Sequence, residues 1–258
     1  MSADTSSLAA VIARRIRLVV PFLTGYDFSD PRANGEYRFL GGYLRPEMTV
    51  FDVGANVGEF ALEALRHQPR LRLHCFEPLS ETFRTLQATL RSVPPEASVA
   101  LNNFGLSDED AAREMVVYGA NAGSNSLYMN PYHAERSAHI ERESVSLRTL
   151  DAYIAEHAVA AVDLLKIDVE GHEQWVLEGA RSSLADGRIK AIMFEYNDYW
   201  RQSGGRLATV MAMLDGFGYR MARLSRLMNI PVRAGDGGLE NFRHSNYVAT
   251  LHRSVPPR

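Results

Sequence analysis

The segment VFDVGANVGEF, residues 50–60, is the feature that most constrains the fold of this chain. An apolar run reaches Asp52 and then passes into a turn of small residues that opens a helix. Gly54 and Gly58 have no Cβ, so the backbone can turn tightly there and a ligand can lie against it. Asp52, at the end of the strand, can accept hydrogen bonds from ligand donors. The segment therefore predicts a strand, a ligand-binding turn and a helix in succession.

The spacing of this turn narrows the class of ligand. It reads Asp-x-Gly-x-Asn-x-Gly, so Asn56 stands where the dinucleotide-binding fingerprint G-x-G-x-x-G has its second glycine. That fingerprint places a pyrophosphate against the N-terminus of the helix, and the spacing here does not supply it. We therefore expect a cationic nucleoside without phosphates.

A second acid follows about twenty residues later, as expected for an acid that binds ribose in a doubly wound fold. The apolar run from Leu71 to Phe76 ends in Glu77 and Pro78. Glu77 could instead cap the helix expected from about residue 80. Because the glycine turn lies upstream, we favour hydrogen bonds from both ribose hydroxyls to Glu77.

At this point the chain resembles the FkbM-type family of S-adenosylmethionine-dependent methyltransferases. Six separate motifs in the same order carry the resemblance, and together they lie within residues 50–197. They are VFDVGANVGEF (50–60), HCFEPLSETFRTLQATL (74–90), NNFGLSDED (102–110), GSNSL (123–127), VSLRTLDAY (145–153) and DLLKIDVEGHEQWVLEGA (163–180). The resemblance implies a class I methyltransferase with S-adenosyl-L-methionine as its cofactor.

Strands and helices alternate along the chain, which predicts an α/β fold with a Rossmann-like, doubly wound and mostly parallel sheet. The parallel series ends in an antiparallel C-terminal hairpin. We divide the chain into an N-terminal helical extension, residues 1–40, with a helix over 7–23, and a methyltransferase domain, residues 41–258. The expected strands are 49–53, 71–76, 98–101, 114–118, 145–147, 162–167, 189–196, 218–224 and 246–251. The expected helices are 57–67, 80–91, 149–157, 172–185 and 205–216.

Composition excludes several classes of function. The formal charge of −3 offers no broad cationic field for a phosphate backbone, so nucleic acid is a poor candidate substrate. Cys75 is the only cysteine, which excludes an internal disulfide and a zinc site made of thiolates. No apolar stretch approaches the roughly 18 to 20 residues of a membrane span. We expect a cytoplasmic enzyme, and the helix over 7–23 could mediate a homodimer.

Two acids follow the two most apolar strands of the predicted sheet. Asp168 follows the run ending at Ile167, and Glu195 follows the run ending at Phe194. The carboxyl ends of parallel strands meet at one crevice, so these acids should lie close together, with Asn197 nearby. Carboxylate and amide oxygens suit Mg²⁺, which could orient an acceptor oxygen. Metal-dependent O-methyltransferases of small molecules offer an analogy.

The general base is expected beside these acids. His172 lies four residues after Asp168, and imidazole can take a hydroxyl proton near neutral pH. Glu170 could act as a second base or as a metal ligand. Glu173 fits the first turn of the next helix, where negative charge is favoured. We expect Lys166 to pair with an acid and to be structural.

Other residues are expected to contact the cofactor or the acceptor. Asn103, Ser107 and Asp108 follow the third strand and could flank adenine, and Ser124 lies in the small-residue loop over 119–130 that could reach the cofactor. Rings that can stack on a sugar could line the acceptor pocket. These residues are Tyr128, Tyr196, Tyr199 and Trp200.

The resemblance implies methyl transfer to a hydroxyl of a sugar or glycan, with a polyketide or other secondary metabolite as the alternative acceptor. Two other classes of function stay open. One is a nicotinamide-dependent oxidoreductase, against which the position of Asn56 argues. The other is a catalytically silent cofactor-binding protein, against which the acids at the later strand ends argue.

Overall fold

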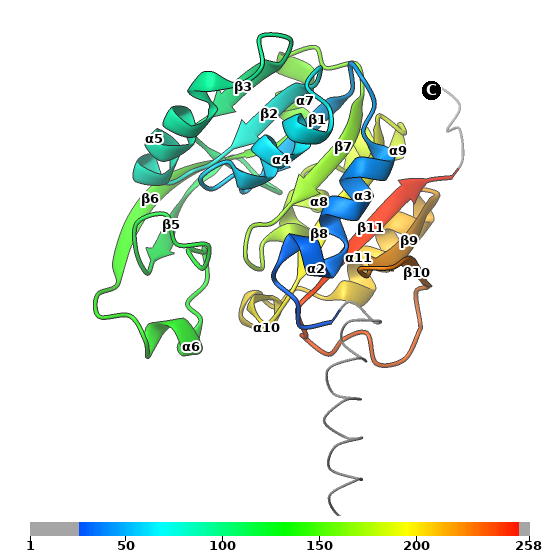
Figure 1. Cartoon of the computed structure of the whole chain (residues 1–258). Coiled ribbons are helices and arrows are strands. Elements are labelled where there is room, and N and C mark those ends of the chain that lie inside the picture. Colours follow the sequence, from blue (N-terminus) through cyan, green and yellow to red (C-terminus); the bar gives the residue numbers. More distant parts are fainter. Residues whose placement is uncertain (1–25, 253–258) are drawn as a thin grey trace, which may run out of the picture.

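The chain folds around one eight-stranded sheet, with helices on both faces (Figure 1). A computed structural model describes residues 26–252, so the predicted helix over 7–23 lies outside the described residues. The strands of this sheet follow the order β10-β9-β11-β8-β7-β1-β2-β3. Their bounds are β1 Thr49–Val53, β2 Arg72–Phe76, β3 Ser98–Asn102, β7 Val162–Ile167, β8 Ile189–Tyr196, β9 Tyr219–Leu224, β10 Asn229–Val232 and β11 Ser245–Leu251.

Strands β8, β7, β1, β2 and β3 run parallel, whereas β11, β9 and β10 add antiparallel pairs at one edge. The predicted Rossmann-like α/β sheet with an antiparallel C-terminal end is therefore confirmed. The bounds of β7 and β8 agree with the prediction, because both strands are mostly apolar and are covered on both faces. Strand β10 was not predicted, since Asn229 and Pro231 break the apolar pattern of this short edge strand.

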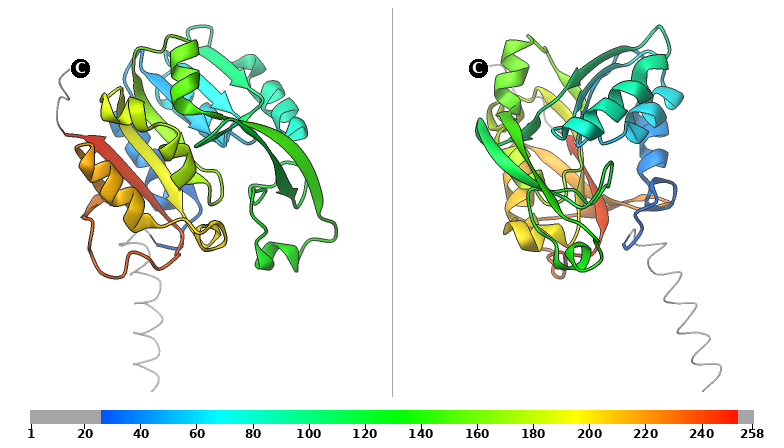
Figure 2. Two further views of the ribbon diagram at one scale, coloured as in Figure 1. Left: turned by 180° about the vertical axis from the view of Figure 1, so that it is seen from behind. Right: turned by 90° about the vertical axis from the view of Figure 1, so that its left-hand side faces the viewer.

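Helices on the two faces bury two separate hydrophobic clusters. Phe39, Leu40 and Leu86 belong to the cluster on one face, and Tyr153, Leu177 and Leu214 belong to the cluster on the other. The first face is covered by α3 Glu36–Tyr43, α4 Glu59–His67 and α5 Ser80–Thr89, which is followed by the 3₁₀ turn η1 Leu90–Ser92. The second face, seen from behind in Figure 2, is covered by α7 Leu150–Glu156, α8 Glu173–Glu178, α9 Arg181–Ala185 and α11 Leu207–Gly216.

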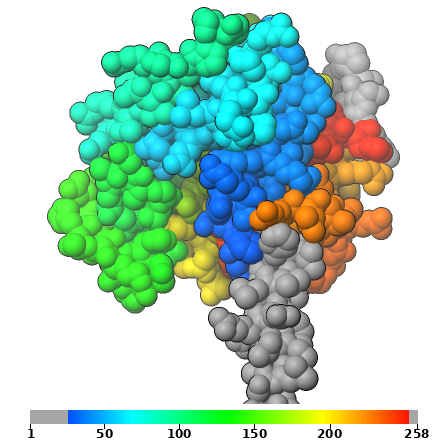
Figure 3. All heavy atoms as spheres, in the orientation of Figure 1, coloured from blue at the N-terminus to red at the C-terminus, as the bar shows by residue number. Residues whose placement is uncertain are grey.

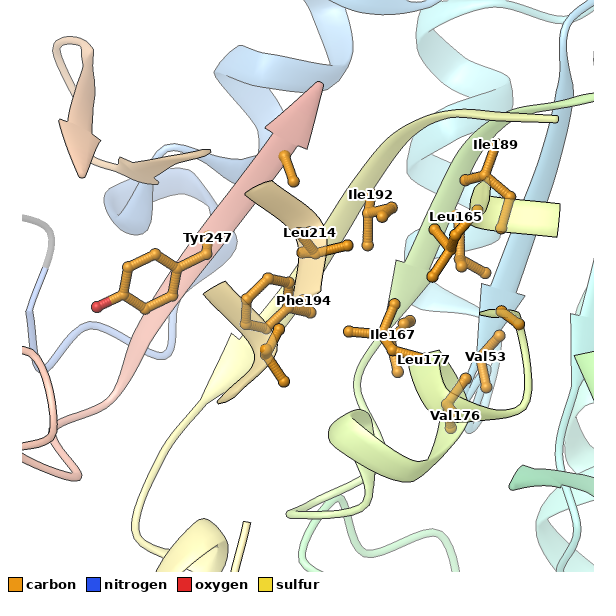
Figure 4. Close-up of a cluster of buried hydrophobic side chains, with 14 of the residues drawn as sticks. Val53, Leu165, Ile167, Val176, Leu177, Ile189, Ile192, Phe194, Leu214 and Tyr247 are labelled. Atoms are coloured by element: carbon orange, nitrogen blue, oxygen red, sulfur yellow. The ribbon is translucent and has the colours of Figure 1, made fainter. Parts of the chain in front are cut away.

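Figure 4 shows buried side chains of the second cluster, through which the strands pack on the helices. Leu165 and Ile167 from β7 lie beside Ile192 and Phe194 from β8, and Leu177 from α8 packs with them. Alternate residues of β7 point to opposite faces, so Leu164 joins the first cluster instead. This packing fixes the carboxyl ends of β7 and β8, which carry Asp168 and Glu195.

The single helix predicted over 172–185 is wrong, because the structure has two short helices there. Helix α8 ends at Glu178 and α9 begins at Arg181. Between them the carbonyl of Gly179 accepts a hydrogen bond from the Asp151 N–H (2.9 Å). The Asp151 carboxylate accepts hydrogen bonds from the N–H groups of Ser182 and Ser183 at the start of α9. These contacts with α7 end one helix and begin the next.

A second, three-stranded sheet forms an arm that extends from the main body (Figure 1). Its order is β4-β6-β5, with β4 Gly105–Ser107, β5 Ala111–Val117 and β6 Glu141–Thr149. Strands β5 and β6 were predicted in outline, but β6 is longer than the predicted 145–147 and β4 was missed. The long connection between β5 and β6 contains the short helix α6 Pro131–Ala134.

The described part of the N-terminal segment packs on the domain that follows it. Helix α2 Pro31–Asn34 precedes α3, and Phe39 and Leu40 of α3 are buried in the same cluster as Val50 of β1. The predicted domain boundary after residue 40 stays a prediction. Within residues 26–252, no helix has the length and the apolar character needed to cross a bilayer.

Candidate functional site

Three adjoining cavities lie at the carboxyl ends of the parallel strands. In the space-filling view, a hollow opens between the blue N-terminal segment and the green arm (Figure 3). We call the three the central cavity, the N-terminal cavity and the aromatic cavity. Glu195 lines all three, and Asp168 lines the first two. Glu170 lines the central and the aromatic cavities. The acids of β7 and β8 therefore stand where the cavities meet.

The central cavity combines the glycine turn, the second acid and an apolar wall. Gly54 and Asn56 line one side, and Glu77 and Pro78 line another. The opposite wall is contributed by the arm, including its strand β4. It includes Gly105, Leu106, Met115, Leu127 and Leu147. A flat apolar ring with polar groups at one end fits such a cavity.

Gly54 is required by the close approach of β1 to β7. Its φ is +78°, and a Cβ at this position would lie 1.8 Å from the carbonyl oxygen of Asp168. The loops that follow the two strands are therefore in direct contact. Any larger residue would push them apart, so the sequence signal at this glycine reflects packing as well as ligand access.

Glu77 is held by the loop it faces. Its Oε2 accepts a hydrogen bond from the Asn56 N–H (3.0 Å), and its Oε1 accepts one from the Leu79 N–H (2.9 Å). Burial raises the pKa of Glu77 to about 7. The Asn56 Oδ1 is buried without a hydrogen-bond partner among residues 26–252. This side of the cavity therefore offers a carboxylate and a free amide oxygen to ligand donors.

Asp52 lies behind the cavity wall, and this corrects its predicted role as a direct ligand contact. Its side chain is 0% exposed and lines none of the three cavities. The Lys166 Nζ lies 3.1 Å from Asp52 Oδ1 and 3.5 Å from Asp168 Oδ2. Burial lowers the pKa of Lys166, but the two carboxylates outweigh it and raise the pKa overall. The prediction that Lys166 pairs with an acid is confirmed.

His172 lines the central cavity but lacks a free nitrogen for the predicted role as base. Its Nε2 lies 2.9 Å from the Ser107 Oγ, and its Nδ1 lies 2.8 Å from the Tyr128 hydroxyl. The Ser107 hydroxyl donates to Asp108, so it accepts from Nε2–H, and Nδ1 accepts from Tyr128. Burial lowers the pKa of His172 to about 4, so the ring is neutral. In this arrangement His172 positions the arm.

Asp168, Glu170 and Glu195 come together as a carboxylate cluster. One oxygen from each lies within 4.8 Å of the others. Burial, together with the neighbouring carboxylates, raises the pKa of both Glu170 and Glu195. The His244 Nε2 lies 2.5 Å from Glu195 Oε1. His244 precedes β11 and was not predicted, because no residue pattern indicates which loop returns to β8.

Asn197 does not present its oxygen to this cluster, which corrects its predicted role as a metal ligand. The Asn197 Nδ2 donates to Glu170 Oε2 (2.8 Å) and to Glu195. Its Oδ1 accepts a hydrogen bond from the Tyr199 N–H (2.9 Å) at the start of α10 Tyr199–Ser203. The amide therefore caps a helix with its oxygen and bridges two carboxylates with its nitrogen.

Glu173 fixes the loop that carries Glu170. It is fully buried, and its Oε1 accepts hydrogen bonds from the N–H groups of Val169 (3.0 Å) and Gly171 (3.3 Å). Glu170 has a φ of +53°, a left-handed backbone conformation that costs free energy and persists because the surrounding contacts hold it. Burial raises the pKa of Glu173 to about 8. The predicted first helical turn is confirmed, but the side chain bonds to the preceding loop.

The aromatic cavity lies between the arm and α10, with a volume of about 520 Å³. Tyr199 lines it, donates from its hydroxyl to the Ser124 carbonyl (2.6 Å) and stacks with His133 at 5.8 Å between ring centroids. Ser124 lines this cavity and not the central one. Tyr132, Phe242 and His244 complete much of the wall.

Several predicted residues lie outside the three cavities. Tyr196 and Trp200 are fully buried in the core, so their predicted place in the acceptor pocket is wrong. Gly58 faces Leu86 of α5. Asn103 donates to the carbonyls of Glu77 and Pro78 and so supports the strand end. Asn103 and three further predicted residues, Ser107, Asp108 and Tyr128, are absent from the cavity walls among the described residues.

Comparisons with known proteins agree on one family. A family model described as the methyltransferase FkbM domain matches residues 52–221. The chain is 32% identical over 203 residues to the 31-O-demethyl-FK506 methyltransferase FkbM of Streptomyces tacrolimicus, covering 69% of this chain and 75% of that protein. It is 24% identical over 163 residues to the 2-O-methyltransferase NoeI of Sinorhizobium fredii, covering 60% and 65% respectively.

A TehB-like SAM-dependent methyltransferase from Corynebacterium glutamicum aligns over 95% of this chain and 97% of its own, with 9% identity and a TM-score of 0.43.

The buried Glu173 yields a prediction about stability and pH. Its pKa of about 8 in the folded chain lies above the ordinary 4.5, so the folded chain keeps a proton that the unfolded chain releases. Its contribution to the free energy of unfolding is therefore complete below pH 4.5 and is lost as the pH rises through 8. Glu173→Gln, which keeps the Oε1 acceptor, should lose about 2 kcal/mol less free energy of unfolding than the parent chain when the pH rises from 6 to 8. Urea unfolding at the two pH values measures this, and equal losses would contradict it.

Proposed function

This chain belongs to the FkbM methyltransferase family, and on that premise we propose that it transfers a methyl group from S-adenosyl-L-methionine to a hydroxyl of a small molecule or sugar. The observation that carries the proposal is the meeting of three unlike cavities at Glu195. One has an apolar wall and a ribose-type acid, one is polar and acidic, and one is aromatic and open. Such a junction can bring the methyl group of a donor to an acceptor oxygen.

The central cavity receives the nucleoside of the donor. Glu77 accepts hydrogen bonds from the ribose hydroxyls, as the acid at the end of the second strand does in doubly wound folds. The Asn56 Oδ1 is a further acceptor on the same side. Leu106, Met115 and Leu147 form an apolar wall for adenine. The charge-free wall and the absence of a pyrophosphate turn favour this nucleoside over a dinucleotide.

The carboxylate cluster suits a cationic donor. S-adenosylmethionine supplies a methyl group on a positively charged sulfur and leaves as S-adenosylhomocysteine when an acceptor oxygen displaces it. Asp168, Glu170 and Glu195 provide negative charge where the three cavities meet. Positioning is the main contribution that the chain makes to such an in-line displacement.

Glu170 takes the proton of the acceptor hydroxyl. It is the predicted catalytic residue that lines both the central and the aromatic cavity, and a carboxylate is a general base when it lies within reach of the hydroxyl proton. The Ser126 hydroxyl donates to the Glu170 carbonyl (2.7 Å), and Asn197 donates to its carboxylate. These contacts hold the carboxylate at the boundary between donor and acceptor.

The acceptor binds in the aromatic cavity through a hydroxyl group. Tyr132, His133 and Tyr199 offer ring faces that can stack on a sugar, and Asn130 and Asp198 offer polar partners for its hydroxyls. A sugar or glycan hydroxyl is the first choice, and a hydroxyl of a polyketide or other secondary metabolite is the second. Transfer to oxygen is supported by the names of the two relatives, both of which specify an O-methyl position.

A magnesium ion fits the carboxylate cluster and belongs to the proposal. The donor set consists of hard oxygens, and the crowding that raises the pKa of Glu170 and Glu195 is relieved by a divalent cation. Asp168 and Glu195 would hold the ion, and Glu170 beside them would remain free to take the proton. When bound, it would lower the pKa of an acceptor hydroxyl and stabilise the resulting oxyanion.

Donor binding is tested by calorimetric titration with S-adenosylhomocysteine. We expect the parent chain to bind it and Glu77→Ala to bind it at least about tenfold more weakly, because hydrogen bonds to a charged group are lost. Thermal unfolding without ligand checks that the variant is folded. NAD serves as the comparison ligand. Binding of NAD without binding of S-adenosylhomocysteine would contradict the proposal and favour an oxidoreductase.

The metal site is tested with Mn²⁺ as a paramagnetic substitute for Mg²⁺. We expect the parent chain to bind one Mn²⁺ ion, which added Mg²⁺ displaces. Asp168→Asn and Glu195→Gln should lose this binding. Electron paramagnetic resonance measures the free ion. Glu81→Gln, on the exposed face of α5, is the matched control and should bind as the parent does. Equal binding by all four proteins would remove the metal from the mechanism.

A further inference from the structure

The N-terminal cavity contains a buried carboxylate from a part of the chain that lies before the family match. Glu36 is the first residue of α3, whereas the match begins at residue 52. We propose that Glu36 binds the ammonium group of the α-amino-acid tail of the methyl donor. This inference rests on the proposed function and adds a recognition residue for one end of the same ligand.

The burial of Glu36 sets it apart from the surface acids of the segment. Its side chain is 9% exposed, yet it lines the N-terminal cavity together with Lys166, Asp168 and Glu195. Its Oε2 accepts a hydrogen bond from Asn246 Nδ2 at 3.5 Å, which is the outer limit for such a bond. Burial raises the pKa of Glu36 to about 7. A ligand cation in the cavity would relieve the cost of burying this charge.

The surrounding backbone holds Glu36 in one place. The preceding Gly35 has a φ of +99°, and a Cβ there would lie 2.2 Å from the Ser225 carbonyl oxygen. Arg38 donates to the same carbonyl from Nε (3.3 Å) and Nη2 (3.2 Å). The Glu36 N–H donates to Asn34 Oδ1 (2.9 Å). The start of α3 is therefore fixed to the end of β9, and its carboxylate is preorganised.

The charges of the cavity favour a cation. Glu36, Glu59, Asp168 and Glu195 line it, and Lys166 is the one basic residue among the described lining residues. The Lys166 ammonium contacts Asp52 and Asp168 and also acts on Glu36, so this single cation faces more carboxylates than it can neutralise. A bound ammonium group would donate charge-assisted hydrogen bonds to these carboxylates. The excess of carboxylates therefore selects a positively charged ligand group.

The shape of the site identifies which ligand group reaches Glu36. The central and N-terminal cavities adjoin at five shared residues, Gly54, Asn56, Gly123, Asp168 and Glu195. A nucleoside in the central cavity thus has its 5′ substituent directed across Gly54 and Asp168 into the N-terminal cavity. In S-adenosylmethionine that substituent carries the sulfonium and then the amino-acid tail. Its ammonium group is the cation available to Glu36.

The experiment compares two ligands that differ in the tail. Calorimetric titrations use S-adenosylhomocysteine, which carries the amino-acid tail, and 5′-methylthioadenosine, which lacks it. We expect Glu36→Gln to weaken binding of S-adenosylhomocysteine by about tenfold or more and to leave binding of 5′-methylthioadenosine within about twofold. Glu36→Asp keeps the charge but shortens the side chain, so its loss should be smaller than that of Glu36→Gln.

A control and three outcomes make the result decisive. Glu47→Gln removes an exposed carboxylate that pairs with Arg72 outside the cavity, and it should bind both ligands as the parent does. Equal weakening of both ligands by Glu36→Gln would show a structural role and overturn the inference. Unchanged binding of both would overturn it as well. If the parent chain binds neither ligand, the proposed function itself fails, which is a different result.

Discussion

The buried ammonium of Lys166 is the interaction on which the arrangement of the site depends. Strands β1 and β7 pair in a register that places Asp52 opposite Lys166. The Lys166 Nζ lies between Asp52 and Asp168, and it also donates to the Gly54 carbonyl (3.3 Å). One side chain therefore connects the strand end, the glycine turn and the first acid of the carboxylate cluster. A buried ion pair contributes little net stability, since desolvation offsets its attraction, so its value here is in placing these groups.

The rest of the site follows from where parallel strands end. Strands β1, β2, β7 and β8 each deliver a polar residue to the same edge of the sheet, and hydrophobic helices on both faces prevent the strands from shifting. The arm adds the missing wall. It is attached by hydrogen bonds from Tyr128 to His172, from Ser126 to the Glu170 carbonyl and from Tyr199 to the Ser124 carbonyl. These contacts turn an open strand edge into three separate cavities.

The sequence predicted the features that depend on local pattern. Mostly apolar runs located β7 and β8, and the spacing of small residues after β1 located the turn beside Glu77. The prediction failed where only tertiary contacts determine the position of a side chain. Nothing near His172 indicates that Ser107 and Tyr128 occupy both ring nitrogens. Tyr196 and Trp200 follow a strand as pocket residues would, but β11 and α11 bury them.

The N-terminal segment contains a residue pattern that is typical of helix boundaries. Asp30 and Pro31 are typical of a helix start, and Gly35 is typical of a helix end, as α2 demonstrates. That pattern would have predicted a second helix beginning at Glu36, although not the return of the helix to the cavity, because this depends on the long-range contact between Gly35 and Ser225.

A crystal structure of the chain with S-adenosylhomocysteine tests the central claim most directly, namely that one donor molecule spans the central and N-terminal cavities at the ends of β1, β2 and β7. The account predicts the ribose hydroxyls within hydrogen-bond distance of Glu77, and the sulfur near Asp168 with an open path to the aromatic cavity. A nucleoside bound outside the central cavity, with Glu77 free of contact, would contradict it.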